Sequence, residues 1–89
     1  MHQVFYTEHA RQDLKRLELK TARRIAGKIH FFSQRKNPLV FAKKIKNSDL
    51  GQYRFRIGDY RALFDVDKKG NIQILIILRI KHRKDIYEL

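Results

Sequence analysis

The stretch YRFRIGDYRALFDV, Tyr53 to Val66, says most about how this chain folds. Apolar residues alternate with Arg54 and Arg56 before the Gly58-Asp59 pair, and a second apolar-rich run follows it. Because a β-strand sends alternate side chains to opposite faces, the pattern predicts a β-hairpin from about residue 52 to about residue 67. One face of the first strand is then apolar, and the other carries guanidinium groups suited to binding phosphate.

Two helices are predicted before this hairpin. Residues 4–6 have the character of a short first strand, and Thr7 is placed to cap a first helix. A second helix is predicted from about residue 19 to about residue 34. Its apolar residues recur at helical spacing: Ala22, Ile25, Ala26, Ile29 and Phe32. Asn37-Pro38 ends this helix, and residues 39–49 are predicted to be irregular and basic.

The segment after the hairpin predicts a central strand. Residues 72–80 are apolar on both faces for much of their length, and a turn at residues 68–71 precedes them. The polar tail is expected to form a single helical turn. The whole chain, residues 1–89, is therefore predicted to be one small α+β domain. Its N-terminal strand and helical hairpin pack on a mostly antiparallel sheet, whose other face is left for function.

The excess of basic residues indicates the kind of molecule that this protein binds. The 89 residues include 21 Lys and Arg against 9 Asp and Glu, a net charge of +12. Such a charge predicts a polyanionic partner: nucleic acid, an acidic protein or an anionic membrane surface. The absence of cysteine excludes disulfides and thiolate metal sites. The N-terminus does not resemble a signal peptide, and the longest apolar run is too short to cross a bilayer, so a cytoplasmic location is expected.

A cluster of proton-transfer and cationic groups is predicted on the open sheet face. Arg54 and Arg56 share one strand face, and Arg61 can join them from the partner strand. The tail, which follows the central strand, adds Lys81, His82, Arg83 and Tyr87. Such a cluster could bind a phosphodiester and move protons, although the same pattern also describes a solvated basic face. The histidines have no metal-ligand spacing and no phosphate-binding glycine motif occurs, so neither a metal nor a cofactor is expected.

The hairpin and the tail together resemble the RelE/ParE toxin superfamily of type II toxin–antitoxin systems. The residues that carry the likeness are 53–64 and 77–87, and the helical pair and the Asn37-Pro38 break also fit. The resemblance implies the RelE-like fold, a small α+β fold similar to that of microbial RNases. RelE-type members enter the ribosomal A site and cut mRNA there. The 2′-hydroxyl attacks the adjacent phosphate, and no metal is required.

The resemblance also implies roles for individual residues. Arg61 matches the arginine that stabilises the phosphate in the transition state. Tyr87 matches a C-terminal tyrosine that stacks on a base and takes part in proton transfer. Lys81 falls where many RelE members have arginine and is expected to supply charge, while His82 either assists proton transfer or holds the tail. Contacts to the RNA are predicted for six further basic residues: Arg54, Arg56, Arg83, Lys43, Lys44 and Lys46.

The partners implied by the resemblance are the ribosome, mRNA and an acidic, RelB-like antitoxin whose disordered segment folds around the toxin. No membrane and no small-molecule cofactor is expected. Two other functions stay open. ParE-type members inhibit DNA gyrase and are not nucleases, and the chain could also be a nucleic-acid-binding module without catalysis. The complete basic set together with Tyr87 favours the ribonuclease.

Overall fold

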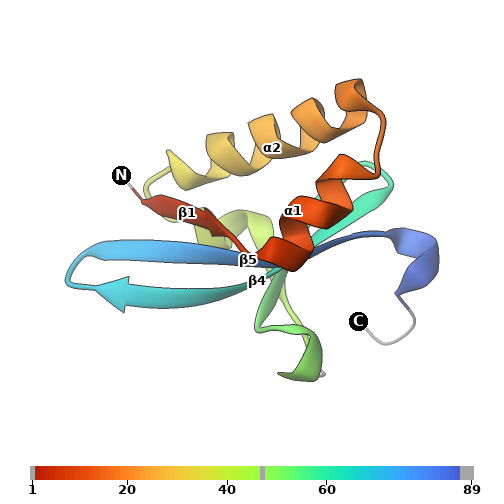
Figure 1. The fold of residues 1–89 in the computed structure, drawn as a ribbon. Coiled ribbons are helices and arrows are strands. Elements are labelled where there is room, and N and C mark those ends of the chain that lie inside the picture. Colours follow the sequence, from red (N-terminus) through yellow and green to blue (C-terminus); the bar gives the residue numbers. More distant parts are fainter. Residues whose placement is uncertain (1, 47, 87–89) are drawn as a thin grey trace.

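The fold, seen in a computed structural model, is described for residues 2–46 and 48–86. In these residues the chain forms two α-helices, a five-stranded sheet and three short 3-10 helices (Figure 1). The α+β class, the hairpin and both helices are confirmed. In chain order the elements are β1 (Gln3–Tyr6), α1 (Glu8–Lys15), α2 (Leu19–Ser33), η1 (Pro38–Phe41), β2 (Ala42–Lys44), η2 (Ser48–Leu50), β3 (Tyr53–Ile57), β4 (Tyr60–Lys69), β5 (Ile72–His82) and η3 (Arg83–Asp85).

The strands lie in the order β1-β5-β4-β3-β2. β1 pairs with β5 in parallel, and every other pairing is antiparallel. The sheet is therefore mostly antiparallel, as predicted. β5 has a neighbour on each side, which confirms it as a central strand. The prediction that residues 39–49 are irregular was wrong, because this segment contains the edge strand β2 and the two short helices beside it. Three residues are too few for alternation to show in a sequence, and pairing with β3 is what makes them a strand.

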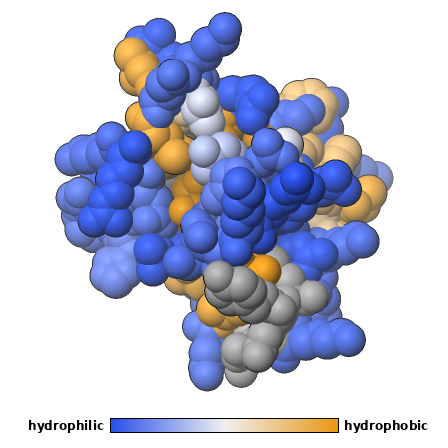
Figure 2. Space-filling view, turned by 90° about the vertical axis from the view of Figure 1, so that its right-hand side faces the viewer, coloured by the Kyte–Doolittle hydropathy of each residue, from blue (hydrophilic) through white to orange (hydrophobic). Residues whose placement is uncertain are grey.

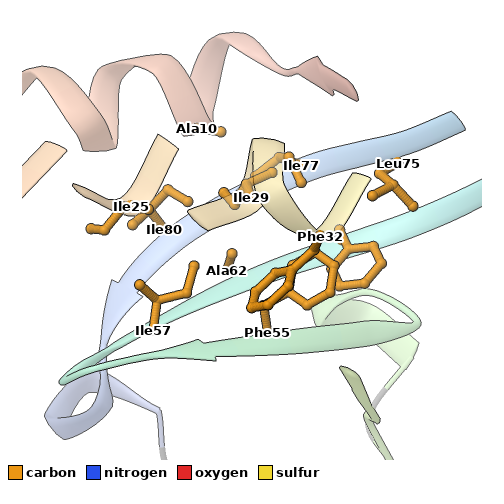
Figure 3. Close-up of a cluster of buried hydrophobic side chains, with 11 residues drawn as sticks. Ala10, Ile25, Ile29, Phe32, Phe55, Ile57, Ala62, Leu75, Ile77 and Ile80 are labelled. Carbon is orange, nitrogen blue, oxygen red and sulfur yellow. The ribbon is translucent and has the colours of Figure 1, made fainter. Parts of the chain in front are cut away.

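The hydrophobic core lies between one face of the sheet and both helices, which cover that same face (Figure 1). The helices contribute Ala10, Ile25, Ile29 and Phe32, and the strands contribute Phe55, Ile57, Ala62, Phe64, Leu75, Ile77 and Ile80 (Figure 3). The predicted cap is also present, since Thr7 Oγ1 accepts a hydrogen bond from the Ala10 amide at 3.2 Å. No helix in the described ranges is both long and apolar enough to cross a membrane.

A β-bulge near the end of β5 exchanges the faces of the sheet to which the following side chains point. Leu63 pairs with Arg79 and Phe64 pairs with Ile77, so Leu78 is an extra residue in β5. Before the bulge, Ile77 faces the helices, and after it Ile80 does. Uninterrupted alternation from Ile77 would have sent the residues at 79 and 81 toward the core. The bulge therefore keeps these two cationic side chains out of the core, and Arg79 instead reaches Asp13 of α1 at the edge of the sheet.

The sheet face away from the helices is partly covered, which corrects the expectation of an open face. Leu50 and Gly51, which precede β3, lie against it, and Leu50 joins Leu63 and Leu78 in lining a hollow of about 400 Å³. Leu63 is fully buried. Gly51 makes the close approach possible, because at φ +125° its missing Cβ would lie 3.0 Å from the Leu78 side chain. The uncovered part of this face is formed by the β3–β4 hairpin and the end of β5.

Asp13 of α1 holds the outer edge of β5 beyond the point where β1 ends. Its Oδ2 accepts hydrogen bonds from the Ile80 amide at 2.9 Å and from Arg79 Nε at 2.8 Å. Its Oδ1 accepts from Arg79 Nη2 at 3.1 Å. Burial raises the pKa of the Asp13 carboxyl, but the hydrogen bonds from Arg79 and Ile80 outweigh it and hold that pKa below its ordinary value. The carboxylate thus satisfies an edge amide that would otherwise lack a strand partner.

We expect Asp13→Asn to lower the free energy of unfolding by about 1–2 kcal/mol near neutral pH, because the hydrogen bonds to a charged acceptor are weakened while one acceptor oxygen remains. The loss stays modest because the Arg79 side chain is 36% exposed, so that solvent screens its interaction with Asp13. Urea unfolding followed by circular dichroism measures the difference. Asp67→Asn, at an exposed position of β4, is the matched control and should change little.

The same comparison should depend on pH with a definite sign. A carboxyl whose folded pKa is depressed contributes stability that is present above its unfolded pKa of about 3.9 and disappears as the pH falls through the folded value. The difference between wild type and Asp13→Asn should therefore shrink on acidification below about pH 4. A difference that stayed constant or grew there would contradict the ionised role of Asp13.

Candidate nucleic-acid interface

Three cationic residues stand in one row across three adjacent strands. Arg56 of β3 pairs with Arg61 of β4, and Arg61 pairs with Lys81 of β5. They lie on the sheet face away from the helices, because their neighbours Ile57, Ala62 and Ile80 belong to the core. The predicted placement of Arg54, Arg56 and Arg61 on one face is confirmed by this register. Directly opposed like charges destabilise a sheet, so the row favours an anionic ligand.

A small hollow opens beside this row. It has a volume of about 170 Å³ and is lined by Phe41, Lys43, Arg54, Arg56 and Arg61. Lys43 reaches it because β2 pairs with β3 so that Lys43 lies opposite Arg54. A water molecule in the liquid occupies about 30 Å³, so the hollow has room for an anion of the size of phosphate. We call these five lining residues the arginine hollow.

Arg61 is the most firmly positioned cation of the arginine hollow. Its Nη1 donates hydrogen bonds to the Gly58 and Tyr60 carbonyl oxygens, both at 2.9 Å. Gly58 has φ +59°, a conformation that glycine adopts without strain, and this turn directs its carbonyl. Burial lowers the pKa of Arg61, and the positive charges of Arg56, Arg54 and Arg83 lower it further. A bound anion would relieve this repulsion while the turn keeps the guanidinium in place.

The start of the tail is tied to the hairpin turn. The Arg83 amide donates to the Asp59 carbonyl at 2.8 Å, and Arg83 Nε lies 3.6 Å from Asp59 Oδ1 in an exposed ion pair. His82 pairs with Tyr60 and lies on the helix side of the sheet, with the two ring centroids 5.1 Å apart. Its Nδ1 accepts a hydrogen bond from the Lys84 amide at 3.1 Å. These contacts favour the tail-holding role for His82 over proton transfer.

The structure brings together some of the predicted site residues and separates others. Lys43 joins the arginines, whereas Lys44 is the next residue of β2 and so faces the other way, opposite Tyr53. Lys46 is exposed beyond the end of β2. Tyr87 lies outside the described residues. Arg79 is engaged by Asp13, although it stands on the same strand as Lys81.

Phe41 is the member of the arginine hollow that the sequence analysis missed. The signal in the sequence was an aromatic residue within the basic segment, two positions before Lys43, but no spacing rule connects it to arginines 13 to 20 positions later. The end of the molecule that carries the hairpin turn and the start of the tail is mainly hydrophilic (Figure 2). Within residues 2–46 and 48–86, no three histidine, aspartate or glutamate side chains group in a way that could hold a metal ion.

Comparison with known proteins places this arrangement in a family. Residues 4–87 match the sequence model of the family described as "ParE toxin of type II toxin-antitoxin system, parDE". The chain is similar to Toxin RelG of Mycobacterium tuberculosis, with 31% identity over 84 residues that cover 94% of this chain and 93% of that protein. Both matches span nearly the whole chain, so they include the hairpin and the end of β5.

Two solved structures are similar in fold and sequence. One is from the RelBE2 toxin–antitoxin complex of M. tuberculosis, with a TM-score of 0.70 and 27% identity, covering 92% of this chain and 98% of that one. The other is from the RelB–RelE antitoxin–toxin complex of Methanococcus jannaschii, with a TM-score of 0.59 and 27% identity, covering 93% and 94%. The five-stranded sheet with two helices on one face is therefore shared with these proteins.

We expect the arginine hollow to dominate the salt dependence of binding to single-stranded oligonucleotides. Each side chain that neutralises a phosphate of a single strand contributes about 0.7 to the slope of log affinity against log salt. Arg56→Gln should reduce the slope by about this amount, measured by fluorescence anisotropy over a salt series. Lys68→Gln removes the same charge near the β4–β5 turn, at the opposite end of the molecule (Figure 1), and should leave the slope nearly unchanged. Equal slopes for the two variants would rule out a localised interface.

Proposed function

The chain belongs to the RelE/ParE superfamily of type II toxins, and we propose that it is a ribosome-dependent endoribonuclease that cleaves mRNA in the A site. The observation that most supports the proposal is the row formed by Arg56, Arg61 and Lys81 beside the arginine hollow. A phosphodiester in this hollow would meet cationic donors from adjacent strands, among them Arg61, whose position is fixed by the hairpin turn. Charge stabilisation in phosphoryl transfer requires such donors.

The reaction we propose is attack by a 2′-hydroxyl of the mRNA on its own adjacent phosphate. The 2′-oxygen loses its proton and bonds to phosphorus. The bond from phosphorus to the 5′-oxygen then breaks, and that oxygen takes up a proton. Extra negative charge develops on the phosphate, where Arg61 is fixed by its bonds to the Gly58 and Tyr60 carbonyls. The cations can therefore supply charge stabilisation without a metal.

The other site residues take supporting roles in this proposal. Lys81 adds charge beside Arg61, which it opposes in register. Arg54, Arg56 and Lys43 hold the RNA backbone at the hollow. His82 positions the tail through its bond to the Lys84 amide, and Tyr87, through the family resemblance, takes the role of base stacking and proton transfer.

We also propose an acidic antitoxin as the partner of this chain. Both similar solved structures come from toxin–antitoxin complexes, and a net charge of +12 favours an acidic protein. Complementary charge should speed association more than it sets affinity, so added salt should slow the on-rate while the complex persists. A cognate partner that proved basic would contradict this proposal.

Action on ribosomes and mRNA would place the protein in the cytoplasm.

Inhibition of DNA gyrase is the second candidate function. The observation in its favour is that the matching family model carries the ParE description. Fold alone does not separate the two activities, since function resides in the site rather than in the architecture. The cation row favours the ribonuclease, because catalysis on a phosphodiester needs charge placed at one point.

We expect purified toxin to cleave mRNA on programmed ribosomes and to leave gyrase supercoiling unaffected. Cleavage should continue in the presence of a metal chelator at a concentration that keeps ribosomes intact, because the proposed charge stabilisation comes from side chains. Naked RNA should be cut poorly, since a shallow basic face holds RNA in many poses and catalysis needs one. Gyrase inhibition without mRNA cleavage would replace this proposal with the ParE-type function.

Arg61→Ala should lower the single-turnover cleavage rate by about 10²–10³, with little change in ribosome binding, because one preorganised donor to the transition state is removed. Lys81→Ala should have a smaller effect of the same kind.

His82→Gln should mainly weaken the attachment of the tail and leave the pH profile of cleavage unaltered, whereas a proton-transfer role would change that profile. For Tyr87, the Phe variant should be less impaired than the Ala variant. Near wild-type cleavage by both Arg61→Ala and Tyr87→Ala would show that the proposed active face is wrong.

A further inference from the structure

We propose that Phe41 is a stacking platform for a nucleobase of the RNA whose phosphate occupies the arginine hollow. The inference deepens the proposed function and rests on RNA being the substrate. It starts from an unusual combination: an exposed aromatic ring lines the same hollow as Lys43 and the arginines. Cationic groups that hold the backbone, combined with aromatic rings that stack on bases, are the general means by which proteins bind single-stranded nucleic acid.

The Phe41 ring is held in one orientation by the core. It stacks on Phe32, with ring centroids 4.8 Å apart and an interplanar angle of 21°. Phe32 in turn packs against Phe55 at 4.6 Å, and Phe55 stacks on Phe64 at 4.2 Å. Phe41 thus joins a set of packed aromatic rings that includes Phe32 and Phe55 of the core, both labelled in Figure 3. A ring fixed in this way loses little conformational entropy when a base stacks on it.

The backbone around Phe41 is also fixed. Phe41 is the last residue of η1, which begins with the buried Pro38 and is capped by Asn37, whose Oδ1 accepts from the Leu39 amide at 3.2 Å. β2 follows immediately and pairs with β3, so the ring stands next to the strand that carries Arg54 and Arg56. Phe41 is nonetheless 42% exposed. Phe32 stacks on this ring and Phe31 meets it edge to face with centroids 6.3 Å apart, while the exposed part of Phe41 lines the hollow.

Other exposed phenylalanines do not combine these properties. Phe31 already has two cations against its ring, with Arg35 at 4.5 Å and Lys28 at 5.4 Å from the centroid. Phe5 lies on β1, at the opposite edge of the sheet from β2. Because one sugar joins the base and phosphate of a nucleotide, an aromatic platform must lie next to the phosphate site. Phe41 meets this condition.

The test uses a short single-stranded 2′-O-methyl RNA that contains 2-aminopurine, a fluorescent base that is quenched when it stacks. The 2′-O-methyl group blocks the attacking oxygen, so the RNA stays intact. We expect wild type to quench the probe and Phe41→Leu, which keeps an apolar cover over Phe32, to bind roughly 5- to 150-fold more weakly with little quenching. Phe41→Tyr should restore both signals. Phe5→Leu, a matched change at the other edge, should behave as wild type.

Two outcomes would overturn the inference: quenching by Phe41→Leu equal to that of wild type, or no quenching by wild type. Cleavage of mRNA on programmed ribosomes separates this failure from failure of the proposed function. A wild type that cleaves, with Phe41→Leu cleaving at the same rate, would reject base stacking and leave the ribonuclease standing. A wild type that binds and quenches the probe but cleaves no mRNA would keep the stacking site and reject the ribonuclease.

Discussion

The extra residue in β5, Leu78, determines which face of the sheet each later side chain of the strand points to. Ile77 and Ile80 both reach the core only because one residue is inserted between their pairing positions. The same insertion turns Lys81 toward Arg61 and sends His82 to the helix side. A single β-bulge therefore decides which residues at the end of β5 point to the core and which point to the opposite face. The row of Arg56, Arg61 and Lys81 depends on this arrangement.

The bulge must be held against slippage, and two parts of the chain hold it from different sides. Asp13 occupies the outer edge of β5 with bonds to Arg79 and the Ile80 amide. Leu50 and Gly51 lie beside the bulge on the face away from the helices, where Gly51 approaches Leu78. Register in a sheet is pinned when each face has a specific apolar partner. The burial of Leu63 on this second face is part of that restraint.

Repulsion within the row of cationic side chains on β3, β4 and β5 destabilises the folded state. Arg56, Arg61 and Lys81 oppose one another in register, and burial and neighbouring charges lower the pKa of Arg61. The aromatic and aliphatic residues behind the row offset this repulsion through burial. A polyanionic ligand would remove the cost, which is why the row and the arginine hollow are a better indicator of function than net charge alone. Membership of the RelE/ParE superfamily is consistent with such a face, although function resides in a site rather than in a fold.

Local sequence patterns were enough to predict the main elements and the family. Alternation in the hairpin, helical spacing in residues 19–34 and the apolar run after residue 72 could be interpreted without knowing what packs where. They also placed Arg54, Arg56 and Arg61 on one face, because a two-residue turn fixes the register of its own hairpin. Tertiary contacts were needed to show that β2 is a strand, that the second sheet face is partly covered, that His82 lies apart from Lys81 and that Phe41 joins the arginines. Each of these depends on pairing or contact between segments distant in sequence, and a one-residue bulge reverses facing without leaving any periodic trace in the sequence.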